Sequence, residues 1–170
     1  LAEKMPDWQA KGIVPDEERY IGPADRAGLY GVKHFTDMFS PRQLLGHCTS
    51  VEVFHELVAE CGGAGQLSEL DKAALTYIAL GLDKMLNYNA RMVRWHANRE
   101  VVAGVFDRHD FAFLWSYAEM APTITGLGYD WVIRQTGKAL QELVTLAGHD
   151  DPDSSGNGQQ HFSPPAYEPP

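Results

Sequence analysis

The side chains best suited to binding an anionic ligand are arginines and histidines that gather past the middle of the chain. They are Arg91, Arg94, His96, Arg99, Arg108 and His109. Trp95 and Trp115 accompany these cations, and arginines beside aromatic rings are typical of surfaces that contact phosphates or stack on bases. The same residues also suit a helix junction in which the arginines pair with Asp107, Asp110 and Glu119, because four arginines are few for a phosphate track.

Composition limits how such a cluster can act. The chain has 170 residues and a net charge of −9, so contact with nucleic acid requires a local basic patch. No apolar run approaches the ~18 residues of a membrane span, and no signal peptide is visible, which predicts a cytoplasmic protein without membrane contact. Cys48 and Cys61 are expected on one helix, too far apart for a disulfide, and therefore reduced.

Other patterns that could support chemistry have simpler explanations. The glycine-rich stretch 62–65 could mimic a nucleotide-binding loop, but the glutamates at every fourth position before it indicate a solvated helix that ends there. The histidines and cysteines near it lack the spacing of a zinc site, so we predict no metal ligands. We also predict no catalytic residue: nucleophilic catalysis needs a Ser or Cys beside a His and an orienting carboxylate, no strained elbow such as G-x-S-x-G is present, and Cys48 and Cys61 are expected to be packing residues. The run Ser163-Pro164-Pro165-Ala166 resembles the motif of amino-group methyltransferases, but it lacks their aromatic residue and lies in a Pro-rich tail.

The first two predicted helices have complete start signals. Ser40 is the expected N-cap of the first, with Pro41 at the first helical position and Gln43 completing a capping box; glycines 62–63 end it. Ser68 begins the second, with apolar residues every three to four positions as far as about Arg94. This length predicts a central scaffold helix.

Shorter helices are expected after the long one. Asn98 can cap a third that carries Val101, Val102, Val105 and Phe106. Asp110 can cap a fourth, with Phe111, Leu114, Trp115 and Ala118 facing inward. Asp130 can cap a fifth that ends at Gly148. The sequence thus predicts an all-α fold of about five helices around one long helix: an extended arm or linker over residues 1–38, a helical domain over 39–148 and a disordered tail over 149–170.

Several of these segments resemble one known family, in order and spacing, over about residues 14–147. The matching segments are Tyr30-Gly31, Asp37-Met38-Phe39-Ser40-Pro41-Arg42-Gln43-Leu44-Leu45, Asp83-Lys84, Tyr88-Asn89, Arg94-Trp95-His96, Arg99-Glu100, Phe106-Asp107-Arg108 and Trp115-Ser116-Tyr117-Ala118-Glu119-Met120-Ala121-Pro122. They resemble the adenine-specific DNA methylases that contain a zinc ribbon and occur in defence clusters.

The resemblance implies the helical segment of a DNA adenine-N6 methyltransferase that uses S-adenosylmethionine. In that family the cofactor motif and zinc ribbon precede this region and the catalytic motif follows it, so we expect no cofactor-binding or catalytic residue in this chain. The expected partners are DNA, through the full-length enzyme, and the rest of the methyltransferase or other defence proteins. The candidate DNA contacts, expected on one face near the active site, are Arg42, Gln43, Arg94, Trp95, Arg99 and Arg108. The alternative is a non-catalytic helical module that binds a basic partner protein through Glu52, Glu56 and Glu60.

Overall fold

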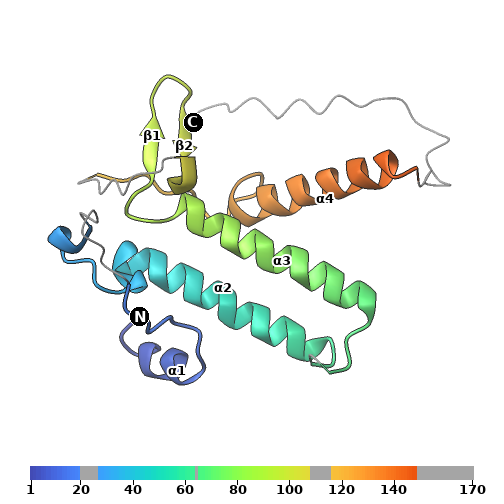
Figure 1. Ribbon diagram of the computed structural model, residues 1–170, viewed down its shortest axis with the longest axis horizontal. Helices are drawn as coiled ribbons and strands as arrows, with labels where there is room; N and C mark the ends of the chain where they lie inside the picture. Colours follow the sequence, from blue (N-terminus) through green and yellow to red (C-terminus); the bar gives the residue numbers. More distant parts are fainter. Residues whose placement is uncertain (20–26, 64, 108–115, 149–170) are drawn as a thin grey trace. The chain divides into compact units, whose positions relative to one another are not determined.

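The computed structural model describes residues 1–19, 27–63, 65–107 and 116–148, and this part of the chain is mostly helical, as predicted (Figure 1). Its helices and strands are α1 (Met5–Ala10), α2 (Pro41–Glu60), α3 (Glu69–Tyr88), β1 (Arg94–His96), β2 (Val101–Ala103) and α4 (Gly128–Leu146), with short 3-10 turns at Ala27–Tyr30, Phe35–Met38 and Val105–Asp107. The chain divides into two compact units, Leu1–Thr136 and Gly137–Pro170, so α4 begins in the first and ends in the second.

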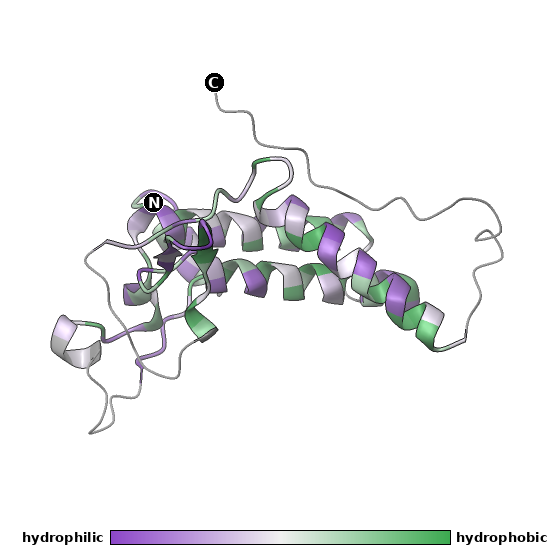
Figure 2. Ribbon diagram, turned by 90° about the horizontal axis from the view of Figure 1, so that it is seen from above, coloured by the Kyte–Doolittle hydropathy of each residue, from purple (hydrophilic) through white to green (hydrophobic). Residues whose placement is uncertain are grey.

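Helices α2 and α3 begin where the sequence predicts. In both, a Ser hydroxyl accepts a hydrogen bond from the backbone N–H three residues on, and the side chain of that residue accepts one from the Ser backbone N–H. The pairs are Ser40 with Gln43 and Ser68 with Asp71. The two helices pack side by side (Figures 1 and 2). Local capping therefore determines where the two long helices of the first unit begin.

The N-terminal residues are more ordered than an extended arm. Helix α1 lies within the segment predicted to be irregular, and its Trp8 is fully buried. Trp8 packs in one cluster with Leu44 and Cys48 of α2, so the segment contributes to the core. The prediction missed α1 because six residues span fewer than two turns, too few for a helical period to show.

The predicted third helix is wrong: β1 and β2 form an antiparallel hairpin there, while α3 ends at Tyr88 and not near Arg94. Trp95 pairs with Val102, and His96 with Val101. Valines and an aromatic residue on both sides of a short polar stretch favour strands, which is the signal that the sequence contained. Asn87 of α3 accepts a hydrogen bond at 2.9 Å from the N–H of Phe106, which lies in the 3-10 turn that follows β2.

Helix α4 begins two residues before the predicted cap. Gly128 has a φ of +55°, and a Cβ on it would lie 2.2 Å from the Pro122 carbonyl oxygen, so only glycine fits this turn. Asp130 still supports the start, because its carboxylate accepts from the Gly126 N–H. Green and purple alternate along α4 in Figure 2, the pattern of an amphipathic helix.

Some predictions concern residues beyond those described. The cap and most of the inward face of the predicted fourth helix lie within 108–115, although Ala118, assigned to the same helix, is in non-helical chain. The predicted tail, 149–170, also lies outside the described residues. Within the described chain, no helix combines the length and apolar character needed to cross a membrane.

Candidate functional site

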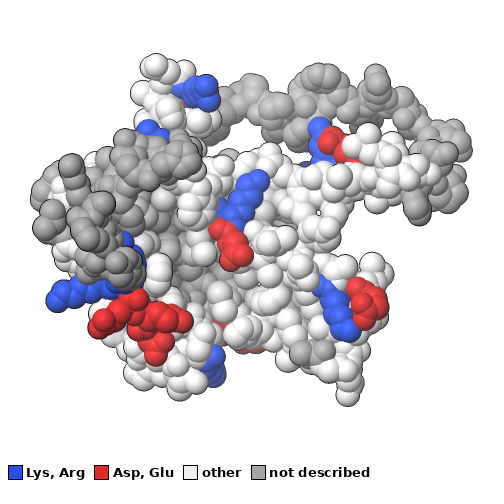
Figure 3. Space-filling view, viewed as in Figure 1, with Lys and Arg blue, Asp and Glu red and all other residues white. Residues whose placement is uncertain are grey.

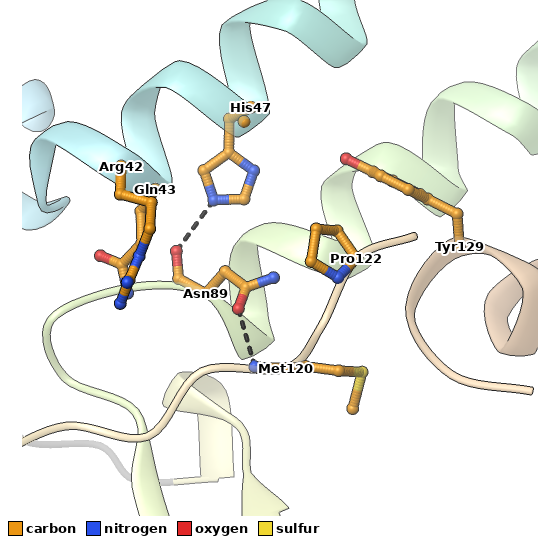
Figure 4. Close-up of a pocket in the computed structure, with 8 residues that line it drawn as sticks. Arg42, Gln43, His47, Asn89, Met120, Pro122 and Tyr129 are labelled. Carbon is orange, nitrogen blue, oxygen red and sulfur yellow. Dashed lines mark hydrogen bonds between the residues drawn. The ribbon is translucent and has the colours of Figure 1, made fainter. Parts of the chain in front are cut away.

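A small hollow lies where the first turn of α2, the end of α3 and the segment 120–129 meet (Figure 4). It encloses about 70 Å³ and is lined by Arg42, Gln43, Gly46, His47, Asn89, Met120, Pro122 and Tyr129. A water molecule takes about 30 Å³ of liquid, and sites that enclose drug-sized ligands usually measure about 300–1,000 Å³. The hollow can therefore hold one small chemical group, but it cannot enclose a nucleoside.

Gln43 supplies a hydrogen-bond donor with a fixed direction. Its side chain is 5% exposed, and its Oε1 accepts from the Ser40 N–H at 2.8 Å to complete the capping box. That bond assigns the amide, because only the oxygen end can accept. The other end, Nε2, is buried and has no partner among the described residues. A buried donor left unpaired is costly, so it marks a place where a ligand acceptor would be stabilised.

Asn89 supplies a second amide donor. Its side chain is 6% exposed, and its Oδ1 accepts from the Met120 N–H at 2.9 Å, which leaves Nδ2 at the other end of the amide, away from Met120 (Figure 4). The Asn89 carbonyl accepts from His47 Nε2 at 2.8 Å, so the proton of that ring is on Nε2. Burial lowers the pKa of His47 below its ordinary 6.5, although the same hydrogen bond raises it. His47 is therefore neutral at pH 7.

Arg42 brings positive charge to the hollow. Its side chain is largely exposed, and its guanidinium forms an ion pair with Glu119 Oε2. Glu119 Oε1 is buried without a hydrogen-bond partner in the described chain. The ion pair balances the charge of Arg42, and the remaining N–H donors of the guanidinium are not used by this pair.

The β1–β2 hairpin carries the other candidate contacts. Trp95 is 57% exposed, and Arg99 lies in the exposed turn between the strands. Figure 3 shows a basic side chain at the hairpin tip, whereas acidic side chains gather beside α1. Phe106, just past β2, is also largely exposed. This ribbon presents an aromatic ring and a cation to solvent.

The structure does not place the five described candidate DNA contacts on one face. Arg94 and Trp95 are neighbours in β1, and successive strand residues point to opposite sides of the ribbon. Arg42 and Gln43 lie instead at the hollow. The two places are linked by the Ala118 N–H, which donates to the Val93 carbonyl at 3.0 Å. Arg108 lies outside the described residues.

The structure also bears on the glycine-rich stretch, on Arg91 and on the cysteines considered in the sequence. Gly62 and Gly63, with φ of +99° and +75°, lie directly after α2, which supports the interpretation as a helix end. Arg91, counted in the basic cluster, donates to the Asp37 carbonyl at 3.2 Å and so fixes a loop. The described residues contain no cluster of three His, Cys, Asp or Glu side chains able to hold a metal ion. The two cysteines are unpaired, and Cys48 is buried while Cys61 is exposed. The motif at 163–166 lies outside the described residues.

Sequence reasoning missed His47 and Asn89 as site residues. They are 42 positions apart, and neither belongs to a local motif with chemical meaning. The fixed amide of Gln43 was the available signal, because a capping box defines which end of that side chain remains open.

Searches for similar proteins give no matching family model, curated protein or solved structure.

Proposed function

We propose that this chain is the helical segment of an S-adenosylmethionine-dependent DNA adenine-N6 methyltransferase, and that its hairpin supports DNA binding. The sequence resemblance supplies the enzyme class. Any cofactor and catalytic residues would come from other parts of the enzyme, as the resemblance implies. The contact with DNA is supported by one observation: an exposed two-stranded ribbon that carries Trp95 and Arg99.

A ribbon of this kind suits a duplex. The major groove of B-DNA is about 12 Å wide and admits a two-stranded β-ribbon. Between residues 91 and 103 the chain has three arginines and one glutamate, so this segment is cationic in an acidic chain. Arg99 at the turn can reach a phosphate or a guanine edge, and the Trp95 ring offers a surface for stacking or apolar contact. If this segment instead covers the active site of the proposed enzyme, the same exposed ribbon would make that contact.

The test is the salt dependence of duplex binding by the 170-residue chain and its Arg99→Ala variant. Loss of one phosphate contact makes the negative slope of log K against log salt concentration shallower by about 0.9, and it weakens binding at low salt. Fluorescence anisotropy with a labelled duplex measures both quantities.

The matched control is Arg134→Ala. It makes the same change of charge on α4, where Arg134 pairs with Asp130. Equal effects of the two substitutions, or no binding by the unaltered chain, would contradict the proposed contact.

A protein-interaction module is the second candidate, and α4 favours it. In the second unit, Leu143, Val144 and Leu146 are 60%, 50% and 83% exposed. Large apolar side chains exposed together on one helix are typical of a protein contact. The acidic face expected to serve such a module is partly used internally, since Glu52 forms an ion pair with Lys4, while Glu56 and Glu60 remain exposed.

A further inference from the structure

We propose that this chain forms a dimer in which the second half of α4 in one copy packs antiparallel along α3 of the other copy. The inference names a partner for the apolar side of α4, and so it rests on the interaction role given above as the second candidate function. It does not depend on the DNA contact of the hairpin.

Helix α3 has two apolar sides, and one of them is left open. Leu75 is 7% exposed and belongs to the core. The opposite side carries a row of apolar residues at steps of four and three, the spacing that places side chains on one face of a helix. Leu70 and Tyr77 in this row are 79% and 39% exposed, and Leu80 beside it is 55% exposed. The row on α3 consists of Leu70, Ala74, Tyr77 and Gly81.

Helix α4 carries a matching row. Its members also follow one another at steps of four and three, which is the spacing of a coiled-coil seam. The row begins at the fully buried Val132, but its last members, Leu143 and Leu146, are largely exposed. The row on α4 consists of Val132, Thr136, Ala139, Leu143 and Leu146.

The first unit shows in which direction these two helices pair. Trp131 meets the ring of Tyr88 edge-on, with 5.6 Å between the ring centroids. One turn later on α4, Gln135 accepts a hydrogen bond at 2.7 Å from Lys84, which lies one turn earlier on α3. The two helices are therefore antiparallel where they touch.

The rows also fit by size. Gly81 leaves room for Val132, because a Cβ on Gly81 would lie 3.1 Å from Val132 Cγ1. Extending the rows antiparallel from this pair sets a large residue opposite a smaller one, then two small residues, then two leucines. Seams of this kind let side chains interdigitate. The further pairs are Tyr77 with Thr136, Ala74 with Ala139, and Leu70 with Leu143.

A second copy is the partner that uses both open rows. The exposed part of the α3 row and the exposed part of the α4 row lie on the same chain, so two copies related by a two-fold axis bury each row twice. A partner with only one such row would leave the other exposed. The net charge of the chain does not oppose the contact on α4, since Lys138 and Glu142 balance each other between residues 137 and 146.

The first test measures mass against concentration by sedimentation equilibrium of the 170-residue chain, where we expect a monomer–dimer equilibrium. Leu143→Asp on the α4 row and Leu70→Asp on the α3 row should each weaken dimerisation at least about tenfold, because the contact would bury an unpaired carboxylate. Both side chains are exposed, so neither change should unfold the chain. Gln141→Asp, on the exposed polar side of α4, is the matched control and should leave the equilibrium unchanged.

The second test identifies what covers the α3 row. One chain carries Ala74→Cys and another carries Ala139→Cys, and both carry Cys61→Ser to remove the exposed thiol. Mixed under oxidising conditions, the two should form a disulfide-linked dimer in higher yield than either chain alone.

A chain that stays monomeric at every concentration would overturn the dimer, and duplex binding by that monomer would leave the hairpin contact standing. A dimer that Leu70→Asp leaves intact would overturn the pairing with α3. Absence of the mixed cross-link would overturn it as well, and a disulfide within one chain that carries both cysteines would then show that α4 covers its own α3.

Discussion

The hollow and the hairpin hold polar side chains in opposite settings. In the hollow, Gln43 and Asn89 are buried, and each amide is fixed by one backbone hydrogen bond. On the hairpin, Trp95 and Arg99 are exposed. Buried, fixed groups contribute to stability and bind with little loss of conformational entropy, whereas exposed ones can be replaced with little effect on the fold. Substitutions in the two regions should therefore separate stability from binding.

The largest expected difference is in the free energy of unfolding. Asn89→Ala removes the acceptor for the part-buried Met120 N–H and should cost about 1–3 kcal/mol. Trp95→Ala, on the exposed ribbon, should change stability by no more than about 0.5 kcal/mol. Urea unfolding followed by circular dichroism measures both. Asn89→Asp, which keeps the accepting oxygen, is the matched control, and equal losses for Asn89→Ala and Trp95→Ala would remove the contrast between the two regions.

A smaller effect is expected from pH, and it belongs to the hollow alone. Burial lowers the pKa of His47 in the folded chain, while the unfolded chain titrates near 6.5. Below that pH the unfolded state binds more protons than the folded state, so stability falls as pH decreases through 6.5 toward the folded pKa. Unfolding curves at a series of pH values should show this loss, and His47→Gln should remove it. A pH dependence that His47→Gln leaves unchanged would show that His47 is not the group responsible.

The helix starts could be predicted from sequence because their causes are local. Ser40 with Gln43, and Ser68 with Asp71, satisfy backbone N–H groups within four residues, so the signal and its effect lie in the same short stretch. The prediction failed where contacts between distant residues determine the secondary structure. The hairpin forms in a segment that can also be read as a helix. The turn that follows it is held by a hydrogen bond from Phe106 to Asn87 of α3, 19 residues away.

The candidate site depends on contacts between distant residues in the same way. Residue type points to Trp95 and Arg99, and the family resemblance adds Arg42; the structure shows that they belong to two separate places. The hollow depends on Asn89 and Met120, which meet across 31 residues, so no local pattern could reveal it. Charge and aromatic content thus identified candidate contacts, but packing determines which of them share a surface.

The central claim, that the hairpin contacts nucleic acid, is tested most directly by NMR of the ¹⁵N-labelled chain with a short duplex. The account predicts that the Trp95 indole N–H and the backbone amides of residues 94–103 shift as the duplex is added, while the amides of residues 139–146 on α4 do not. No shift in the hairpin, or shifts confined to α4, would contradict it.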